Sequence, residues 1–162
     1  MNKILLLSIR PQYSEKIFSG EKSTELRRLR PAVEAGDLVL VYTSAPSCEM
    51  TGAFLVRAVD DGTPETLWQT VRNSCGLTRQ QYDDYFRGSK KAYAIGIERA
   101  WRLESPFKLA HIRNRSVQFH PPQSYRYLDP TDLSILFPAV TARGLLPRKR
   151  RSMRPRPTTV AG

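Results

Sequence analysis

The sequence is poor in cysteine, histidine and long apolar runs, and each shortage excludes a class of protein. Only two of its 162 residues are cysteine and two are histidine, so it has no disulfide framework and no paired zinc-ligand spacing. We therefore expect neither a metal nor a cofactor. No apolar run reaches the about 18 residues that a membrane span needs, and the short apolar start of the chain lacks a signal-peptide cleavage site. These absences predict a soluble, cytoplasmic protein without a membrane partner.

Acidic residues are also scarce relative to basic ones, but the imbalance is local. The chain has 15 Asp and Glu against 26 Lys and Arg, and six of the basic residues lie between positions 148 and 156, so the rest carries 20 basic against 15 acidic side chains. The end of the chain has almost no apolar surface to offset the entropy of ordering. We predict one domain at 1–145 and a disordered basic tail at 146–162. The tail either contacts nucleic-acid phosphates or is simply solvated, and its basic residues include Arg148, Lys149, Arg150 and Arg151.

Hydrophobic periodicity predicts a mixed order of strands and helices. Apolar, β-branched runs predict strands at 3–9, 38–43, 50–59, 91–103 and 124–128, and an extended segment at 22–29. Helical spacing and N-cap residues predict helices at 11–19 and from positions 63, 78 and 129. This order disfavours a doubly wound parallel sheet. We predict an α+β fold, with a small mixed or antiparallel β-barrel and peripheral helices.

The densest polar chemistry lies between Gly20 and Arg27. A glycine at position 20 lets the chain reverse after the predicted helix, which would place Lys22 at the lip of the barrel. Glu25 and Arg27, two residues apart in an extended segment, project to one face. A carboxylate beside a guanidinium fixes both groups and leaves N–H donors for an anion. The alternative is a surface ion pair that contributes little, beside a solvated lysine.

These four positions, Gly20-x-Lys22-x-x-Glu25-x-Arg27, resemble the G-x-K-x-x-E-x-R signature of the ASCH domain, a branch of the PUA-like superfamily. The order of elements around them is similar to that family from residue 1 to about residue 103. The resemblance implies that the protein binds RNA or a nucleotide-like ligand in a cleft lined by the motif. It also implies a regulatory role in transcription or RNA metabolism.

The same resemblance leaves a hydrolase open. In the acetylcytidine amidohydrolases, an ASCH-like branch, a threonine stands three residues after the motif lysine, where this chain has Glu25. The hydroxyl nucleophile is therefore absent from its place. Other members of the superfamily branch cleave RNA, which needs only a general base and charge stabilisation. A ribonuclease or modified-nucleoside amidohydrolase that uses Lys22 and Glu25 is thus the alternative.

Further candidate ligand-binding residues lie outside the motif. Ser8, Arg10 and Ser44 lie at the ends of the first two predicted strands and would face the motif if the barrel closes, although serine also serves turn hydrogen bonds. Tyr125 and Arg126 form a second candidate contact strip. Tyrosine rings stack on unpaired bases, but at strand positions they more often pack in a core. Both interpretations apply to Tyr42, Tyr93, Tyr125 and Tyr127.

The basic tail yields a first testable prediction. If RNA is the ligand, its affinity falls steeply with added salt, because phosphate contacts release counterions. Deleting residues 147–162 is expected to reduce the slope of log affinity against log salt concentration. Anisotropy titrations of a labelled single-stranded RNA at several salt concentrations measure that slope. An unchanged slope would show that the tail is a bystander.

Overall fold

The computed structural model describes residues 3–138 and 140, which form six strands and five helices. The strands are β1 (Ile4–Ile9), β2 (Thr24–Arg27), β3 (Leu38–Thr43), β4 (Glu49–Gly62), β5 (Ala92–Lys108) and β6 (Tyr125–Leu128). The helices are α1 (Pro11–Ser19), α2 (Pro64–Val71), α3 (Arg79–Phe86), α4 (Leu109–Arg115) and α5 (Pro130–Leu136). The predicted α+β class is confirmed. The predicted tail, with its boundary at 145/146, lies outside the described residues.

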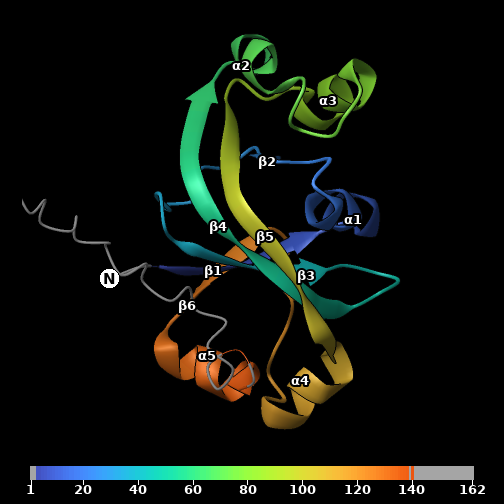
Figure 1. The fold of residues 1–162 in the computed structure, drawn as a ribbon, viewed down its shortest axis with the longest axis vertical. Helices are drawn as coiled ribbons and strands as arrows, with labels where there is room; N and C mark the ends of the chain where they lie inside the picture. The colour runs from blue at the N-terminus through green and yellow to red at the C-terminus, as the bar shows by residue number, and fades with distance from the viewer. Residues whose placement is uncertain (1–2, 139, 141–162) are drawn as a thin grey trace, which may run out of the picture.

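All six strands belong to one sheet, in the order β2-β5-β4-β3-β1-β6. Only β1 and β3 run parallel among the described strands, and the other pairs are antiparallel. The sheet curls into a half-barrel, with α2 and α3 at one end and α4 and α5 at the other (Figure 1). This arrangement confirms the predicted small mixed sheet with peripheral helices. None of the helices within the described residues is long and apolar enough to cross a membrane.

Local sequence signals set several of these boundaries. The first helix begins at Pro11, where proline suits the first helical turn, and Gly20 closes it with a left-handed φ of 87°. The hydroxyl oxygen of Thr63 accepts a hydrogen bond from the Thr66 N–H at the start of α2. Thr78 caps α3 through a reciprocal capping box with Gln81. The two helices form an insert between β4 and β5, at the positions where the sequence predicts helices.

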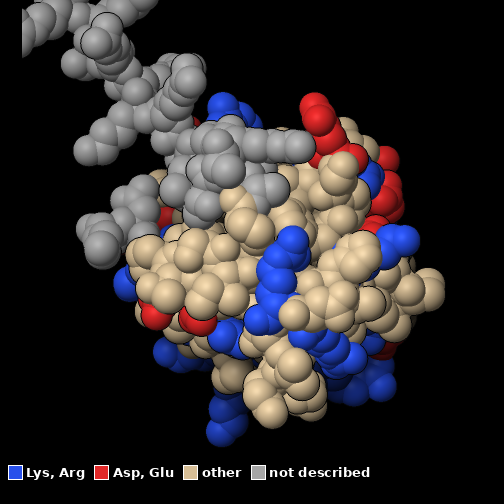
Figure 2. All heavy atoms as spheres, turned by 90° about the horizontal axis from the view of Figure 1, so that it is seen from below, with Lys and Arg blue, Asp and Glu red and all other residues tan. Residues whose placement is uncertain are grey.

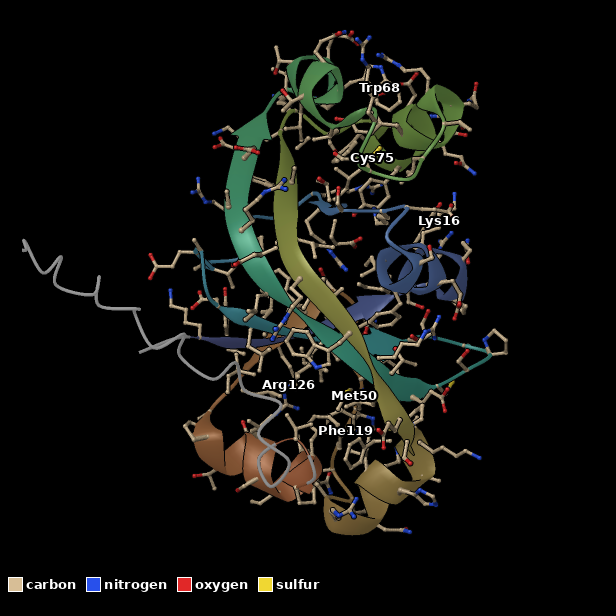
Figure 3. All side chains as sticks on the ribbon, in the orientation of Figure 1. Lys16, Met50, Trp68, Cys75, Phe119 and Arg126 are labelled. Carbon is tan, nitrogen blue, oxygen red and sulfur yellow. The ribbon has the colours of Figure 1, made fainter. Side chains whose placement is uncertain are left out.

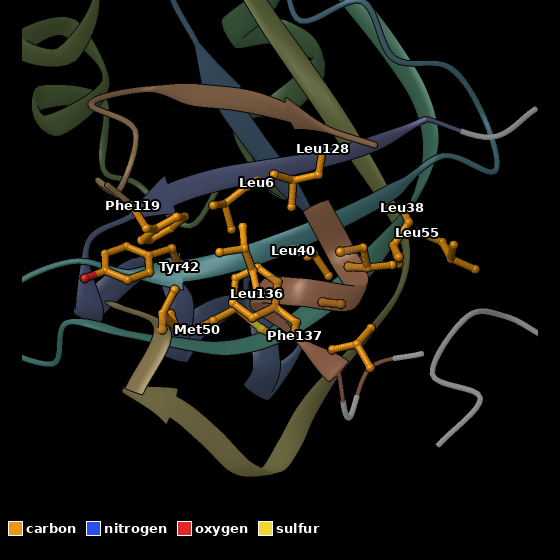
Figure 4. Close-up of a cluster of buried hydrophobic side chains, with 14 residues drawn as sticks. Leu6, Leu38, Leu40, Tyr42, Met50, Leu55, Phe119, Leu128, Leu136 and Phe137 are labelled. Carbon is orange, nitrogen blue, oxygen red and sulfur yellow. The ribbon is translucent and has the colours of Figure 1, made fainter. Parts of the chain in front are cut away.

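Both faces of the central strands are buried, which explains their continuous apolar runs. On one face, Leu6, Leu40 and Met50 form a cluster with residues of α4 and α5, and Phe137 lies at its centre (Figure 4). On the inner face of the curl, alternate residues of β1 and β3 cluster with Ile17 of α1. A third cluster docks the α2–α3 insert on β2 and β5.

The structure decides between the two interpretations of Tyr42 in favour of core packing. Its side chain is only 2% exposed and lies beside Phe119 in the first cluster (Figure 4), so its ring cannot stack on a base. Burial, with a smaller effect of Cys48, raises the pKa of the Tyr42 phenol to about 12. Tyr42 is a core residue.

Two elements differ from the prediction. No helical periodicity marks α4 in the sequence, because Ile112 is the only buried residue of that helix. Strand β5, which pairs with β4 in a long two-stranded ribbon, continues past the predicted end at Leu103 to Lys108, although it contains Pro106. Its pairing with β4 is interrupted between Arg102 and Phe107, which leaves the proline outside the regular ladder.

Gly52 provides a test of the packing. A Cβ atom there would lie 2.3 Å from the Trp101 carbonyl oxygen and 2.6 Å from the Phe18 ring. We expect Gly52→Ala to lower the free energy of unfolding by about 1–3 kcal/mol or more, because backbone on one side cannot move aside. Urea unfolding followed by tryptophan fluorescence measures the change.

Gly96→Ala is the matched control, because Gly96 lies in β5, the strand that pairs with β4. Its Cβ would meet the Arg57 guanidinium at 3.1 Å, and the end of an exposed arginine can move. The Gly96 variant should therefore lose much less stability than the Gly52 variant. Equal losses of unfolding free energy in the two variants would contradict the close packing described at Gly52.

Candidate functional site

A buried charge cluster occupies the motif. The Lys22 ammonium nitrogen lies 3.2 Å from Glu25 Oε2, and Arg27 Nη2 lies 3.0 Å from Glu25 Oε1. The side chains of Lys22, Glu25 and Arg27 are only 2%, 8% and 9% exposed, in that order. One carboxylate therefore serves two cations, and the cluster carries a formal charge of +1. Burying an unbalanced charge is costly unless hydrogen bonds satisfy it, so the partners of each group matter.

Lys22 lies beneath the helical insert and not at the lip of the barrel, which corrects the prediction. The left-handed turn at Gly20 directs the chain inward, and the Lys22 ammonium donates a hydrogen bond of 2.7 Å to the Cys75 carbonyl oxygen. It also lies 5.7 Å from the centroid of the Tyr13 ring. Beside it, the backbone N–H groups of Ser23 and Thr24 both donate to the Ser74 carbonyl. Lys22 thus attaches the linker between α2 and α3 to the barrel.

Arg27 closes the half-barrel. Its Nη2 donates to the Ser8 carbonyl oxygen at 2.9 Å and its Nη1 to the Ser124 carbonyl oxygen at 3.4 Å. Ser8 belongs to β1 and Ser124 precedes β6, whereas Arg27 belongs to β2 at the opposite edge of the sheet. We call this contact, made by Arg27 with the carbonyls of Ser8 and Ser124, the closing seam.

Two tyrosines of β6 extend the closing seam. The Tyr125 hydroxyl donates to the Arg30 carbonyl at 3.3 Å, and the Ala32 N–H donates to the Tyr127 hydroxyl oxygen at 2.6 Å. Both contacts join the segment after β2 to the strand at the other edge of the sheet. Tyr125 and Tyr127 therefore hold the barrel closed with their polar ends.

One N–H group of the cluster lacks a partner. Arg27 Nε is buried and makes no hydrogen bond within the part of the chain that the structure describes. The guanidinium therefore keeps a donor while its other nitrogens are engaged. A buried cation with an unused donor suits an anionic acceptor.

Positive charge also gathers around Tyr85, close to Arg27. Burial, with a smaller effect of the Glu25 charge, raises the pKa of the Tyr85 phenol, and the charges of Arg27, Arg28 and Arg10 oppose that rise. The Tyr85 hydroxyl donates to the Leu26 carbonyl at 3.1 Å, and the Arg28 guanidinium lies 5.1 Å from the Tyr85 ring centroid. Arg10 and Arg28 are exposed. Two exposed arginines thus flank the buried cluster.

The structure brings most of the predicted site residues together. Ser8 contributes its carbonyl to the closing seam, and its hydroxyl donates to the Pro122 carbonyl at 2.5 Å. The Ser44 N–H donates to the Ile9 carbonyl, which places Ser44 next to Arg10. Gly20 supplies the turn before the cluster. The roles of these residues toward a ligand stay predictions.

Arg126 is not brought to the cluster. Alternation along β6 sends it to the face opposite Tyr125, where its guanidinium lies 5.6 Å from the Phe119 ring centroid and 3.8 Å from an Asp132 oxygen. Figure 3 shows Arg126 with Phe119 on the side of α4 and α5, far from Cys75 in the insert. Tyr125 and Arg126 therefore do not form one contact strip.

Sequence reasoning missed three contributors: Tyr85 and the carbonyl groups of Cys75 and Ser124. Tyr85 lies in a helical pattern with Tyr82 and Phe86, which signals an apolar face and no polar role. Backbone carbonyls carry no signal in the side-chain pattern at all. Only the docking of the insert and the pairing of β6 bring these groups to the motif.

No group of three His, Cys, Asp or Glu side chains within the described residues is arranged to hold a metal ion. The polar atoms at the cluster are an ammonium, a guanidinium and one carboxylate, whose two oxygens already face cations. Such a set of donors favours an anion over a metal ion.

Comparison with known proteins gives consistent matches. The ASCH domain profile matches residues 7–101. A Zymomonas mobilis protein named ASCH domain-containing ribonuclease is 31% identical over 126 residues, which are 78% of this chain and 84% of that protein. The crystal structure of ASCH from Zymomonas mobilis superposes with a TM-score of 0.77 at 29% identity, covering 83% of this chain and 93% of that one.

A more distant match shares the fold alone. The N-terminal domain of Staphylothermus marinus McrB has a TM-score of 0.53 at 14% identity, covering 84% of this chain and 97% of that domain. The curled sheet is therefore found in proteins whose sequences have diverged widely.

The charge cluster yields a stability prediction. Glu25→Gln leaves two buried cations side by side, so we expect a loss of about 3–5 kcal/mol in the free energy of unfolding. Adding Lys22→Met removes one of those cations. The double variant should therefore be more stable than the sum of the two single losses implies, by about 0.5–3 kcal/mol. Urea unfolding of the three variants and the unaltered chain measures this coupling.

Glu65→Gln is the matched control at the surface. Glu65 also pairs with an arginine, Arg79, but its side chain is 65% exposed. Its loss should be much smaller than that of Glu25→Gln, because water screens the pair. If the losses of unfolding free energy at Lys22 and Glu25 are strictly additive, the two side chains do not interact, which would contradict the ion pair described above.

Proposed function

Because the chain belongs to the ASCH domain family, we propose that it binds RNA at the closing seam, with the exposed Arg10 and Arg28 facing the phosphates and the buried Arg27 adding its charge behind them. The single observation that carries the proposal is this concentration of cations: two exposed arginines beside a buried cluster with one excess positive charge. The name of the Zymomonas mobilis relative, a ribonuclease, supports RNA as the ligand class.

The charges at the seam favour a phosphate. The buried cluster carries one excess positive charge, and Arg10 and Arg28 add two exposed ones around Tyr85. Guanidinium groups present paired N–H donors that match phosphate oxygens. Phosphate contacts supply most of the affinity of proteins that bind nucleic acids without reading their sequence.

Lys22 and Glu25 act in this proposal as positioning residues. Glu25 accepts from Arg27 and so sets the direction of its guanidinium, and Lys22 holds the same carboxylate from the other side. Both side chains are less than a tenth exposed, and their charged atoms are already engaged by protein groups. A regulatory role in RNA metabolism would rest on binding alone.

A second candidate function is RNA cleavage. One specific observation favours it: the 31% identical relative, matched over 84% of its own length, is named a ribonuclease. Against it, the Lys22 ammonium is occupied by the Cys75 carbonyl and by Glu25. A reaction that used Lys22 and Glu25 would require the α2–α3 linker to move away from them. An amidohydrolase is less favoured still, because no hydroxyl stands three residues after Lys22.

Binding at the seam is tested at Arg10, which is exposed and whose loss leaves the buried cluster intact. We expect Arg10→Ala to weaken binding of a labelled 20-nucleotide single-stranded RNA several-fold. The slope of log affinity against log salt should fall by about 0.7, the value for one lost phosphate contact on a single strand. Fluorescence anisotropy at several salt concentrations gives both quantities.

Arg72→Ala provides the control, because Arg72 is also exposed but follows α2 in the insert and takes no part in the closing seam. It changes the net charge by the same amount and should leave the slope almost unchanged. Equal effects of the two variants would mean that the seam is not the binding site. Absence of RNA binding by the unaltered chain would refute the proposal outright.

Cleavage is tested separately with Lys22→Arg, which keeps the positive charge beside Glu25. Labelled RNA and acetylated cytidine are incubated with the unaltered protein and with the variant. Turnover by the unaltered protein that disappears in a variant with intact RNA binding would establish the enzyme. If the unaltered protein turns over neither substrate, the binding function stands alone.

A further inference from the structure

The net charge of the domain is concentrated in one stretch of sequence. Between positions 108 and 126 the chain has four basic residues and no acidic one: Lys108, Arg113, Arg115 and Arg126. The remainder of residues 1–147 has 16 basic and 15 acidic side chains, a net charge of only +1. Nearly all the excess charge outside the basic tail therefore comes from 19 residues that form α4, the following loop and the start of β6.

Three of these basic side chains are available at the surface. Lys108, Arg113 and Arg115 are exposed, at the start and in the last turn of α4. Lys108 and Arg115 make no ion pair or hydrogen bond with another side chain of the described residues, whereas Arg113 Nε donates to the Phe119 carbonyl at 3.3 Å. We call these three residues the basic end.

The fold places the basic end at the α4–α5 end of the molecule. Figure 2 views that end directly, and blue Lys and Arg side chains gather over the middle of the face. The nearest acids in sequence are Glu104, four residues before Lys108, and Asp129, which caps α5. Asp132 pairs with Arg126. Glu49 lies opposite Lys108 in the β4–β5 ladder, but no ion pair joins the two within the described residues.

The loop after α4 connects the basic end with the closing seam. It runs from Arg115 to Ser124, and the Ser124 carbonyl accepts from Arg27. Within it, the Pro122 carbonyl accepts from the Ser8 hydroxyl. A single stretch of chain without acidic residues thus leads from the exposed cations of α4 to the proposed RNA site.

We propose that the basic end binds the phosphate backbone of the same RNA strand that the closing seam holds. The inference rests on the proposed RNA-binding function and adds a second contact surface to it. A flexible polyanion suits the arrangement, because it can follow the loop from one group of cations to the other while its charge is distributed along its length. Neither Lys108 nor Arg115 makes an ion pair with a described side chain, so a phosphate has no ion pair to displace there, although Glu49 lies opposite Lys108 in the ladder.

The test is a charge-reversal pair with a matched control. Lys108→Glu/Arg115→Glu alters the basic end, and Arg72→Glu/Lys90→Glu makes the same change in net charge at the insert end. Each pair combines an exposed lysine with an exposed arginine that lies at the C-terminal end of a helix. Melting temperatures of both variants are measured first, to verify that each one folds.

Anisotropy titrations with a 20-nucleotide single-stranded uridylate measure the outcome. The basic-end variant should bind at least about tenfold more weakly than the control variant, and its salt slope should fall by about 1.4, the value for two lost phosphate contacts. Equal affinities of the two variants, when Arg10→Ala still weakens binding, would overturn the second surface and leave the closing seam as the site. No binding by the unaltered chain would instead refute the proposed function itself.

A polyglutamate peptide of 20 residues is the competitor that distinguishes RNA from an acidic protein. If the basic end is built for a phosphate backbone, the peptide should displace the RNA only at a large molar excess. Displacement at concentrations comparable with an unlabelled RNA of the same length would overturn the assignment to RNA and point to an acidic protein surface.

Discussion

The structure depends on one buried guanidinium that joins the two edges of a single sheet. Arg27 of β2 donates to the carbonyls of Ser8 and Ser124, so the strands at opposite ends of the sheet order meet around it. Glu25 makes this burial possible, because a guanidinium without a counter-charge would cost several kcal/mol to desolvate. The half-barrel therefore needs the ion pair as much as it needs its apolar clusters.

Lys22 connects this closure to the helical insert. Its hydrogen bond to the Cys75 carbonyl and its contact with Glu25 place one ammonium between the insert and the barrel. Any displacement of the α2–α3 linker would remove the Cys75 carbonyl from Lys22 and leave Glu25 as the acceptor of its ammonium. The insert and the seam are thus coupled through one carboxylate, and the motif has a structural role whatever ligand the protein binds.

Much of the fold could be predicted because its signals are local. Pro11 and Gly20 bound the first helix, and threonines at 63 and 78 cap the next two. The proximity of Lys22, Glu25 and Arg27 follows from their spacing, but their burial does not. It depends on the insert, whose Cys75 lies 53 residues after Lys22 in the chain. The direction of Arg126 depends on the register of β6 against β1, which alternation alone leaves undecided. The helix α4 buries too few apolar residues to produce a periodic pattern.

Buried and exposed cations in this molecule have different physical consequences. At the seam, Arg27 is less than a tenth exposed, so salt screens its interactions weakly and its position is held by protein groups. At the two ends of α4, Lys108 and Arg115 are exposed. Salt therefore screens their attraction for a phosphate, with a Debye length of about 8 Å at physiological ionic strength. A ligand held at both places would lose the contribution of α4 as salt increases and retain more of that of the seam. The buried arginine would then determine where the strand is bound, and the exposed cations would determine how strongly binding responds to salt.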